Sequence, residues 1–223
     1  MPEVLILVFG YNHTLPDWEA CMWGKPALGV YGRASLALRI AESYSSPLIF
    51  LGGGGVICDD GVSDASAART LIINRAEELY GCSHESDLGH LDALDKQLHL
   101  DIIAHDTTQE VREAFALCEE RAISKMILVS SPTHSARCLQ SALVHKEVNG
   151  GCVTDVQAHP SDMNYQNTSA KDVVIIEPPH LHTSHKIPWN TLVKQMLPMV
   201  KGNKNSESFA KELEALLKKY ENI

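Results

Sequence analysis

The chain has 223 residues, of which 44% are hydrophobic and 21% charged, with 14 glycines and 10 prolines. This composition excludes collagen-like, disordered and coiled-coil proteins, and a chain of this length can bury a core without help from disulfides or a metal. Its 19 basic and 28 acidic residues give a formal charge of -9, which disfavours nucleic acid as the main partner because phosphate backbones are repelled.

The first apolar segment, Val4 to Phe9, predicts a strand. It lacks the basic leader of a signal peptide, and no segment approaches the roughly 18 apolar residues that a membrane helix needs. The six cysteines are scattered without a CxxC pair, as reduced thiols of cytoplasmic proteins are. We therefore expect a soluble, cytoplasmic protein without a membrane partner.

Short apolar runs alternate with helical patterns along the chain. Strands are expected at 4–9, 48–51, 102–104, 126–129, 153–156 and 173–176, and helices at 32–43, 64–80, 108–122 and 133–147. This alternation predicts an α/β domain over residues 1–200, with a mainly parallel sheet and helices on both sides. Residues 201–223 are expected to form a linker and an amphipathic helix, which could pack on the body or support a homodimer.

Ligands of such sheets bind beyond the carboxyl ends of the strands. The loops expected there are 10–14, 52–60, 105–108, 130–134, 159–164 and 177–185. The first of them contains Asn12, a candidate for ligand binding. Nearly every other chemically interesting residue also falls in or beside these loops.

The most informative segment runs from Ser130 to Arg137. Ser131 is expected to cap a helix whose first residue is Pro132. His134 and Arg137 share a face near the positive end of that helix, an arrangement that favours a bound phosphate or carboxylate. In the alternative interpretation Ser131 only caps, His134 packs, and Arg137 pairs with a surface carboxylate.

Four glycines, at positions 52 to 55, follow the second predicted strand. They could let a backbone approach a ligand closely, with Gly52 and Gly53 as the candidate contacts, or they could form a turn. Neither a Walker loop nor the GxGxxG spacing of dinucleotide-binding proteins is present.

Thr107 and Glu110 have the spacing of a capping box, in which the two side chains satisfy backbone amides at a helix start. The Glu110 carboxylate could instead face the ligand. A looser group, His180, His182 and His185 with His159, could supply imidazoles to Zn²⁺, but an exposed loop fits equally well. We assign no metal ligand from the sequence. The absence of a G-x-S-x-G elbow or an evident Cys–His pair gives no support for covalent catalysis.

Taken together, these segments resemble the YdcF-like family of domains of unknown function, which includes the SanA-like and ElyC-like proteins. The resemblance spans residues 4–158 and rests on Val8-Phe9-Gly10, Arg33-Ala34, Leu51-Gly52-Gly53, Asp64-Ala65, Thr108-Gln109-Glu110 and the Ser130 to Arg137 segment. The family pattern usually has Glu at the position of Asp64 and Asn at that of Val111.

The resemblance implies a Rossmann-like three-layer sandwich whose crevice joins the glycine loop, the Thr-x-Glu segment and the His-x-x-Arg helix start. The candidate catalytic residues are His134, Glu110 and Asp64, and the candidate ligand-binding residues are Gly52, Gly53, Arg33, Thr108, Ser131, Arg137 and Asn12. S-adenosylmethionine or a divalent metal could serve as cofactor.

The function expected from these residues is hydrolysis or group transfer on a small phosphorylated or nucleotide-like molecule. The alternative is a non-catalytic protein that binds a nucleotide or S-adenosylmethionine. A scaffold that acts through its C-terminal helix is a third interpretation.

Overall fold

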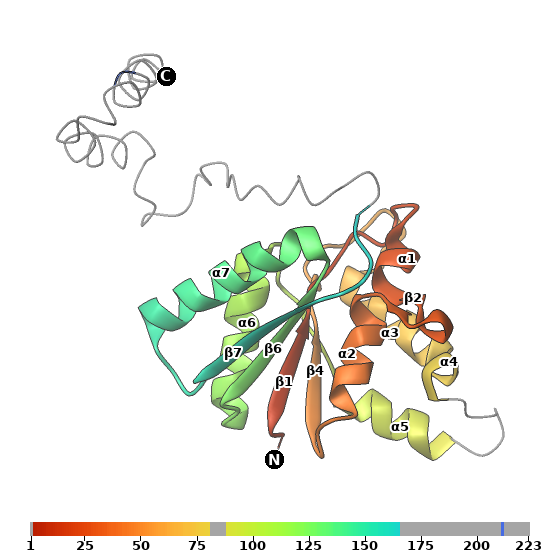
Figure 1. Cartoon of the computed structure of the whole chain (residues 1–223), viewed down its shortest axis with the longest axis horizontal. Helices are drawn as coiled ribbons and strands as arrows, with labels where there is room; N and C mark the ends of the chain where they lie inside the picture. Colours follow the sequence, from red (N-terminus) through yellow and green to blue (C-terminus); the bar gives the residue numbers. More distant parts are fainter. Residues whose placement is uncertain (1, 81–87, 166–210, 212–223) are drawn as a thin grey trace. The chain divides into compact units, whose positions relative to one another are not determined.

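The computed structural model describes residues 2–80, 88–165 and 211, and the chain divides into two units, Met1–Ile175 and Ile176–Ile223. A parallel sheet forms the centre of the first unit, in the order β5-β4-β1-β6-β7 (Figure 1). Its strands are β1 (Val4–Val8), β4 (Pro47–Leu51), β5 (Leu98–Leu100), β6 (Lys125–Ser130) and β7 (Asp155–Pro160). The predicted α/β fold with a parallel sheet is confirmed.

Helices cover both faces of the sheet, so the unit has three layers. Figure 1 shows α6 and α7 on one face and α2 and α3 on the other. The helices are α1 (Trp18–Trp23), α2 (Arg33–Ala41), α3 (Asp64–Arg75), α4 (Glu77–Tyr80), α5 (Leu88–Gln97), α6 (Thr107–Arg121) and α7 (Pro132–Asn149). A 3-10 turn (Pro26–Leu28) lies between two short antiparallel strands, β2 (Gly24–Lys25) and β3 (Val30–Tyr31).

Strand β1 is buried on both faces because its alternate side chains enter two different cores. Val4, Ile6 and Val8 pack with apolar residues of α2 and α3. Leu5 and Leu7 pack with apolar residues of α6 and α7. A strand covered on both sides is expected to be apolar throughout, as the VLILV sequence of β1 is.

The strand order places the carboxyl ends of β1 and β6 at the centre of the sheet. The chain builds outward from β1 through β4 to β5, and then crosses to β6 on the other side of β1. In parallel sheets, ligands bind at such a reversal of direction, where the loops after the two neighbouring strands diverge. The loops after Val8 and Ser130 flank this position.

The prediction of a strand at 102–104 is wrong. The strand is Leu98–Leu100, and Ile102 and Ile103 are exposed. The chain turns around the buried Asp101, whose carboxylate accepts hydrogen bonds from the backbone N–H groups of Ile103, Ala104 and Gly54. This apolar segment does not form a strand, because the Asp101 carboxylate satisfies the backbone amides that a sheet would otherwise pair.

Other boundaries differ less. The helix predicted at 64–80 divides at Ala76 into α3 and α4, and the strand predicted at 153–156 lies at Asp155–Pro160. Helices α1 and α5 were not predicted. The predicted strand at 173–176, the His180, His182 and His185 group and the predicted domain boundary near 200 lie outside the described residues. So does the predicted C-terminal helix except for Lys211, which is helical.

Within the described residues, no helix has both the length and the apolar character needed to cross a bilayer. The described cysteines are all free thiols: Cys21, Cys58, Cys118, Cys138 and Cys152.

Candidate functional site

Arg33 lies at the start of α2, and its side chain is wholly buried at the carboxyl end of β1. Its Nη1 group donates to the backbone oxygens of Phe9 and Gly10, at 2.9 and 2.8 Å. Its Nε donates to Ser131 Oγ at 3.0 Å, and its Nη2 donates to the Tyr165 hydroxyl at 2.5 Å. Arg33 therefore connects the loops after β1 and β6, and it makes no ion pair with any carboxylate in the described ranges.

Two tyrosine rings accompany this cation. The Arg33 guanidinium lies 5.4 Å from the centre of the Tyr11 ring and 5.1 Å from that of Tyr165. The two rings also contact each other, with their centres 4.9 Å apart. Aromatic faces attract a cation through their negative electrostatic potential, and they offset part of the cost of burying Arg33.

Glu110 is buried in the first turn of α6, beside the ends of β1 and β4. Its Oε1 accepts a hydrogen bond of 2.8 Å from the backbone N–H of Gly10. Burial raises the pKa of Glu110 from 4.5 to about 7, although the Gly10 N–H and Arg33 favour the ionised form. A carboxyl with this pKa exchanges protons near neutral pH, as a general acid or base must.

The predicted capping box of Thr107 and Glu110 is wrong. The residue that caps α6 is Asp106, whose side chain accepts from the Gln109 N–H at 2.9 Å. Thr107 therefore lies inside the helix, and its hydroxyl is 3.1 Å from His134 Nε2. Because Asp106 satisfies the helix start, the Glu110 carboxylate turns inward to Gly10.

His134 lies in the first turn of α7, with both ring nitrogens at hydroxyl groups. Nε2 contacts Thr107, and Nδ1 is 3.0 Å from Ser130 Oγ. Burial, together with Arg33 and Arg137, lowers the pKa of His134 from 6.5 to about 3. The ring is therefore neutral at physiological pH, where it can donate or accept a hydrogen bond but cannot supply the charge of an imidazolium.

Ser131 occupies the N-cap position of α7, as predicted, and Pro132 is the first helical residue. The Ser131 hydroxyl, however, does not cap the helix and instead accepts from Arg33. Arg137 is partly exposed, and among the described residues it has no ion-pair or hydrogen-bond partner. Its charge nevertheless acts on His134, so a second cation lies near the start of α7.

The glycine loop is buried against the protein itself. A side chain on Gly52 would overlap the Glu110 carboxylate, and one on Gly54 would overlap the backbone at Asp101. Gly53, with φ of +81°, adopts a left-handed conformation that favours glycine. These residues are glycines because protein atoms fill the space of a side chain, and a direct contact of Gly52 or Gly53 with a ligand stays a prediction.

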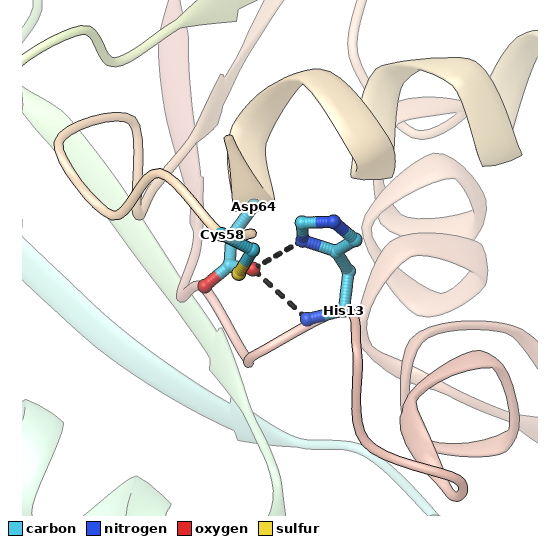
Figure 2. A group of neighbouring side chains, drawn as sticks. All are labelled: His13, Cys58 and Asp64. Atoms are coloured by element: carbon cyan, nitrogen blue, oxygen red, sulfur yellow. Dashed lines mark hydrogen bonds and ion pairs between the residues drawn. The ribbon is translucent and has the colours of Figure 1, made fainter. Parts of the chain in front are cut away.

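A second cluster forms where the loop after β1 meets the start of α3 (Figure 2). The Asp64 Oδ1 atom accepts from the backbone N–H of His13 at 2.9 Å and is 2.8 Å from His13 Nδ1. His13 Nε2 is 3.0 Å from Asp60 Oδ2. Cys58 Sγ lies beside this pair, and one ligand atom each from His13, Cys58 and Asp64 lie within 4.8 Å of one another. These donor types are ones that bind transition metals.

Carboxylates dominate the electrostatics of this second cluster. Burial lowers the pKa of His13, but hydrogen bonds to Asp60 and Asp64 outweigh it and raise that pKa above 6.5. Burial, together with Asp64, Asp60 and Asp59, raises the pKa of the Cys58 thiol. The imidazole is thus held between two acidic groups, with a thiol at its side.

The structure brings most of the candidate residues together, in two neighbouring groups. Arg33, Glu110, Ser131 and His134 form the first, and Asp64 belongs to the second. Asn12 is exposed beside the second group, where its side-chain oxygen accepts from Thr14 and is 3.6 Å from Cys58 Sγ. Thr108 is exposed on α6 and is not brought to either group by any contact of the described residues.

Sequence reasoning missed several participants: Tyr11, His13, Cys58, Asp101, Thr107, Ser130 and Tyr165. Ser130, His13 and Cys58 lie in loops that were expected to hold the site, so their position after a strand was an available signal. Tyr165 carried no such signal, because nothing local predicts that its hydroxyl meets Arg33.

Comparison with known proteins finds no family model that matches the chain, no matching curated protein and no matching solved structure. The resemblance to the YdcF-like proteins stays a prediction from motifs.

Proposed function

We propose that the protein is an enzyme that binds a small phosphorylated or nucleotide-like molecule where β1 and β6 end, and that it hydrolyses this molecule or transfers a group from it. The observation that carries the proposal is the buried Arg33, a cation that links the loops after both strands without a carboxylate partner among the described residues. Buried charges are normally paired. An anionic ligand near this position would supply a permanent counter-charge, which Glu110 supplies only when it is ionised.

Other groups at the same edge also favour an anion. Arg137 lies one helical turn from His134 near the N-terminus of α7, where the helix dipole is positive. The exposed part of Arg137 is suited to hold a phosphate by two hydrogen bonds. His134 is uncharged and is held by Thr107 and Ser130, so the positive charge at this helix start comes from Arg137.

Glu110 is the group we assign to proton transfer. It is buried at the same edge, and its pKa of about 7 allows it to give or take a proton at neutral pH. We assign this step to Glu110 rather than to His134, because a pKa of about 3 makes the neutral ring a weak base and leaves no imidazolium to act as an acid at neutral pH. Asp64, bound to His13, is assigned to the neighbouring cluster.

The test is a ligand panel of nucleotides, sugar phosphates and S-adenosylmethionine, measured by thermal shift and by mass spectrometry of the products. A ligand of this class should raise the melting temperature and be converted to product. Glu110→Gln should retain the thermal shift and lose product formation. Stabilisation without product in the unaltered protein would favour the non-catalytic binding function instead.

Arg137→Ala tests whether Arg137 binds the anion, as distinct from the effect of removing any arginine. It should weaken binding of the stabilising ligand by about 1.5 to 3 kcal/mol, the contribution of a hydrogen bond to a charged group. Arg112→Ala is the matched control, because Arg112 is exposed on α6 and pairs with Glu113. Equal affinity of the two variants would refute the assignment of Arg137.

We also propose that the protein works in the cytoplasm. The free thiols of the described cysteines support a reducing compartment. Fractionation of cells followed by thiol labelling would test this location, and recovery of the protein in an oxidising compartment would contradict it.

A further inference from the structure

We propose that His13, Cys58 and Asp64 form a binding site for a transition metal, with Zn²⁺ as the preferred ion. The site is separate from the groups assigned to the anion and to proton transfer. It lies beside them, since His13 and Gly10 belong to the same loop after β1.

The ligand atoms are close to the spacing that a tetrahedral ion requires. Bonds of about 2.0 to 2.3 Å to nitrogen, oxygen and sulfur place the ligand atoms about 3.3 to 3.8 Å apart. One atom each from His13, Cys58 and Asp64 lie within 4.8 Å of one another, and His13 Nδ1 is 2.8 Å from Asp64 Oδ1. Figure 2 shows the three side chains gathered at one place, and we infer that side-chain rotations bring one atom of each to a single ion.

The remaining nitrogen of His13 is already oriented as in known metal sites. With Nδ1 on the metal, Nε2 carries the proton and donates to Asp60 Oδ2, which lies 3.0 Å away. A carboxylate behind a metal-binding imidazole fixes its orientation and increases its basicity. Asp60 therefore acts as a positioning residue rather than a ligand.

The backbone holds Cys58 in place opposite Asp64. The Cys58 N–H donates to Val62 O at 3.1 Å, and the Gly61 N–H returns to Cys58 O at 2.9 Å. An isolated bridge between Ile57 and Ser63 closes this turn directly before α3. The thiol and the carboxylate thus come from the two ends of one closed turn, whose backbone hydrogen bonds hold Cys58 and Asp64 near each other without the ion.

The donor types decide the class of ion. A thiolate and an imidazole favour Zn²⁺ and other borderline or soft ions, whereas Mg²⁺ and Ca²⁺ prefer oxygen ligands. Three protein ligands leave the fourth tetrahedral position to water or to an oxygen of a ligand, as in catalytic zinc sites. The proposed metal site does not rest on the proposed function, because an ion can bind to these three residues without any turnover.

The experiment uses the full-length, tag-free protein, stripped with a chelator and titrated with Co²⁺. We expect an absorption band of thiolate-to-Co²⁺ charge transfer that saturates at one ion per chain. Added Zn²⁺ should abolish the band by displacement, since its filled d shell gives no such transition, and Mg²⁺ should leave it intact. The absence of any thiolate band would overturn the proposal.

Variants identify the site. Cys58→Ser should lose the band, whereas Cys152→Ser, which removes another half-buried free thiol, should keep it. Asp60→Asn should keep the band but weaken Zn²⁺ binding ten- to a hundredfold, the effect of losing a partner behind the metal ligand. Circular dichroism of each variant verifies that it is folded.

A competing site could lie in the His180, His182 and His185 segment. Replacement of these three residues by Asn should leave the Co²⁺ band and its stoichiometry unchanged. Loss of the band in this variant, or its persistence in Cys58→Ser, would overturn the assignment to His13, Cys58 and Asp64.

Discussion

The carboxylate of Glu110 occupies the space that a side chain on Gly52 would need, although the two residues lie on different elements after β4 and on α6. Its Oε1 is at the same time 2.8 Å from the Gly10 N–H. Two strand ends and one helix therefore meet at a single buried acid. The absence of a side chain at Gly52 is what makes room for it.

Gly52→Ala should destabilise the protein by about 2 to 3 kcal/mol, because the new methyl group overpacks a filled, buried position. The three nearest atoms to that methyl group all belong to the Glu110 side chain. In a Glu110→Ala background the same substitution should cost less than about 1 kcal/mol. Urea unfolding of the four proteins in this double-mutant cycle measures the coupling. An equal cost in both backgrounds would contradict the packing described.

The free energy of unfolding should depend on pH through Glu110. Its pKa is 4.5 in the unfolded chain and about 7 in the folded protein, so between these values only the folded state holds the proton. The contribution of this proton is complete below pH 4.5, and about 3 kcal/mol of it is lost as the pH rises to 7. Glutamine at position 110 cannot titrate. The free energy of unfolding of Glu110→Gln, relative to that of the unaltered protein, should therefore rise by about 3 kcal/mol between pH 4.5 and 8.

Urea unfolding of both proteins across this pH range measures the difference, in which the titration of other groups cancels. A difference that stays constant with pH would show that the Glu110 pKa is not raised.

Arg33→Met should destabilise the protein by about 3 kcal/mol or more. Methionine fills much of the same apolar volume, but it leaves the Phe9 and Gly10 carbonyls and the Ser131 hydroxyl without their buried donor. Arg39→Met is the matched control on the same helix, since Arg39 is 59% exposed and pairs only with Glu42 among the described residues. That control should change stability by less than about 0.5 kcal/mol. Similar melting temperatures for the two variants would refute the structural role of Arg33.

His134 should remain neutral at pH 5, well below the pKa of an ordinary histidine. Its pKa of about 3 reflects burial and the nearby charges of Arg33 and Arg137. The ring-proton NMR signal that disappears in His134→Gln identifies the residue, and its chemical shift should be flat from pH 8 to pH 5. A titration midpoint near 6.5 would mean that the ring is solvated and the hydroxyl contacts are not maintained.

The sequence predicts best those features that depend on local pattern. Strand β1 is apolar because it is covered on both faces, and the helix start at Ser131 and Pro132 follows from residue types alone. The prediction of a capping box at Thr107 was wrong because Asp106, one residue earlier, caps the helix instead. Residue spacing alone does not decide which of these two neighbours caps the helix. His13 and Cys58 were missed because their meeting with Asp64 depends on how two loops fold together.

The central place of β1 in the sheet has a consequence for synthesis and folding. Leu5 pairs with Leu48 on one side and with Met126 on the other. During synthesis, the apolar strand β1 therefore has one unpaired edge until β6 has left the ribosome. Pairing over such sequence distances slows folding and leaves strand edges open to aggregation. This protein should consequently need chaperones more during translation than after it.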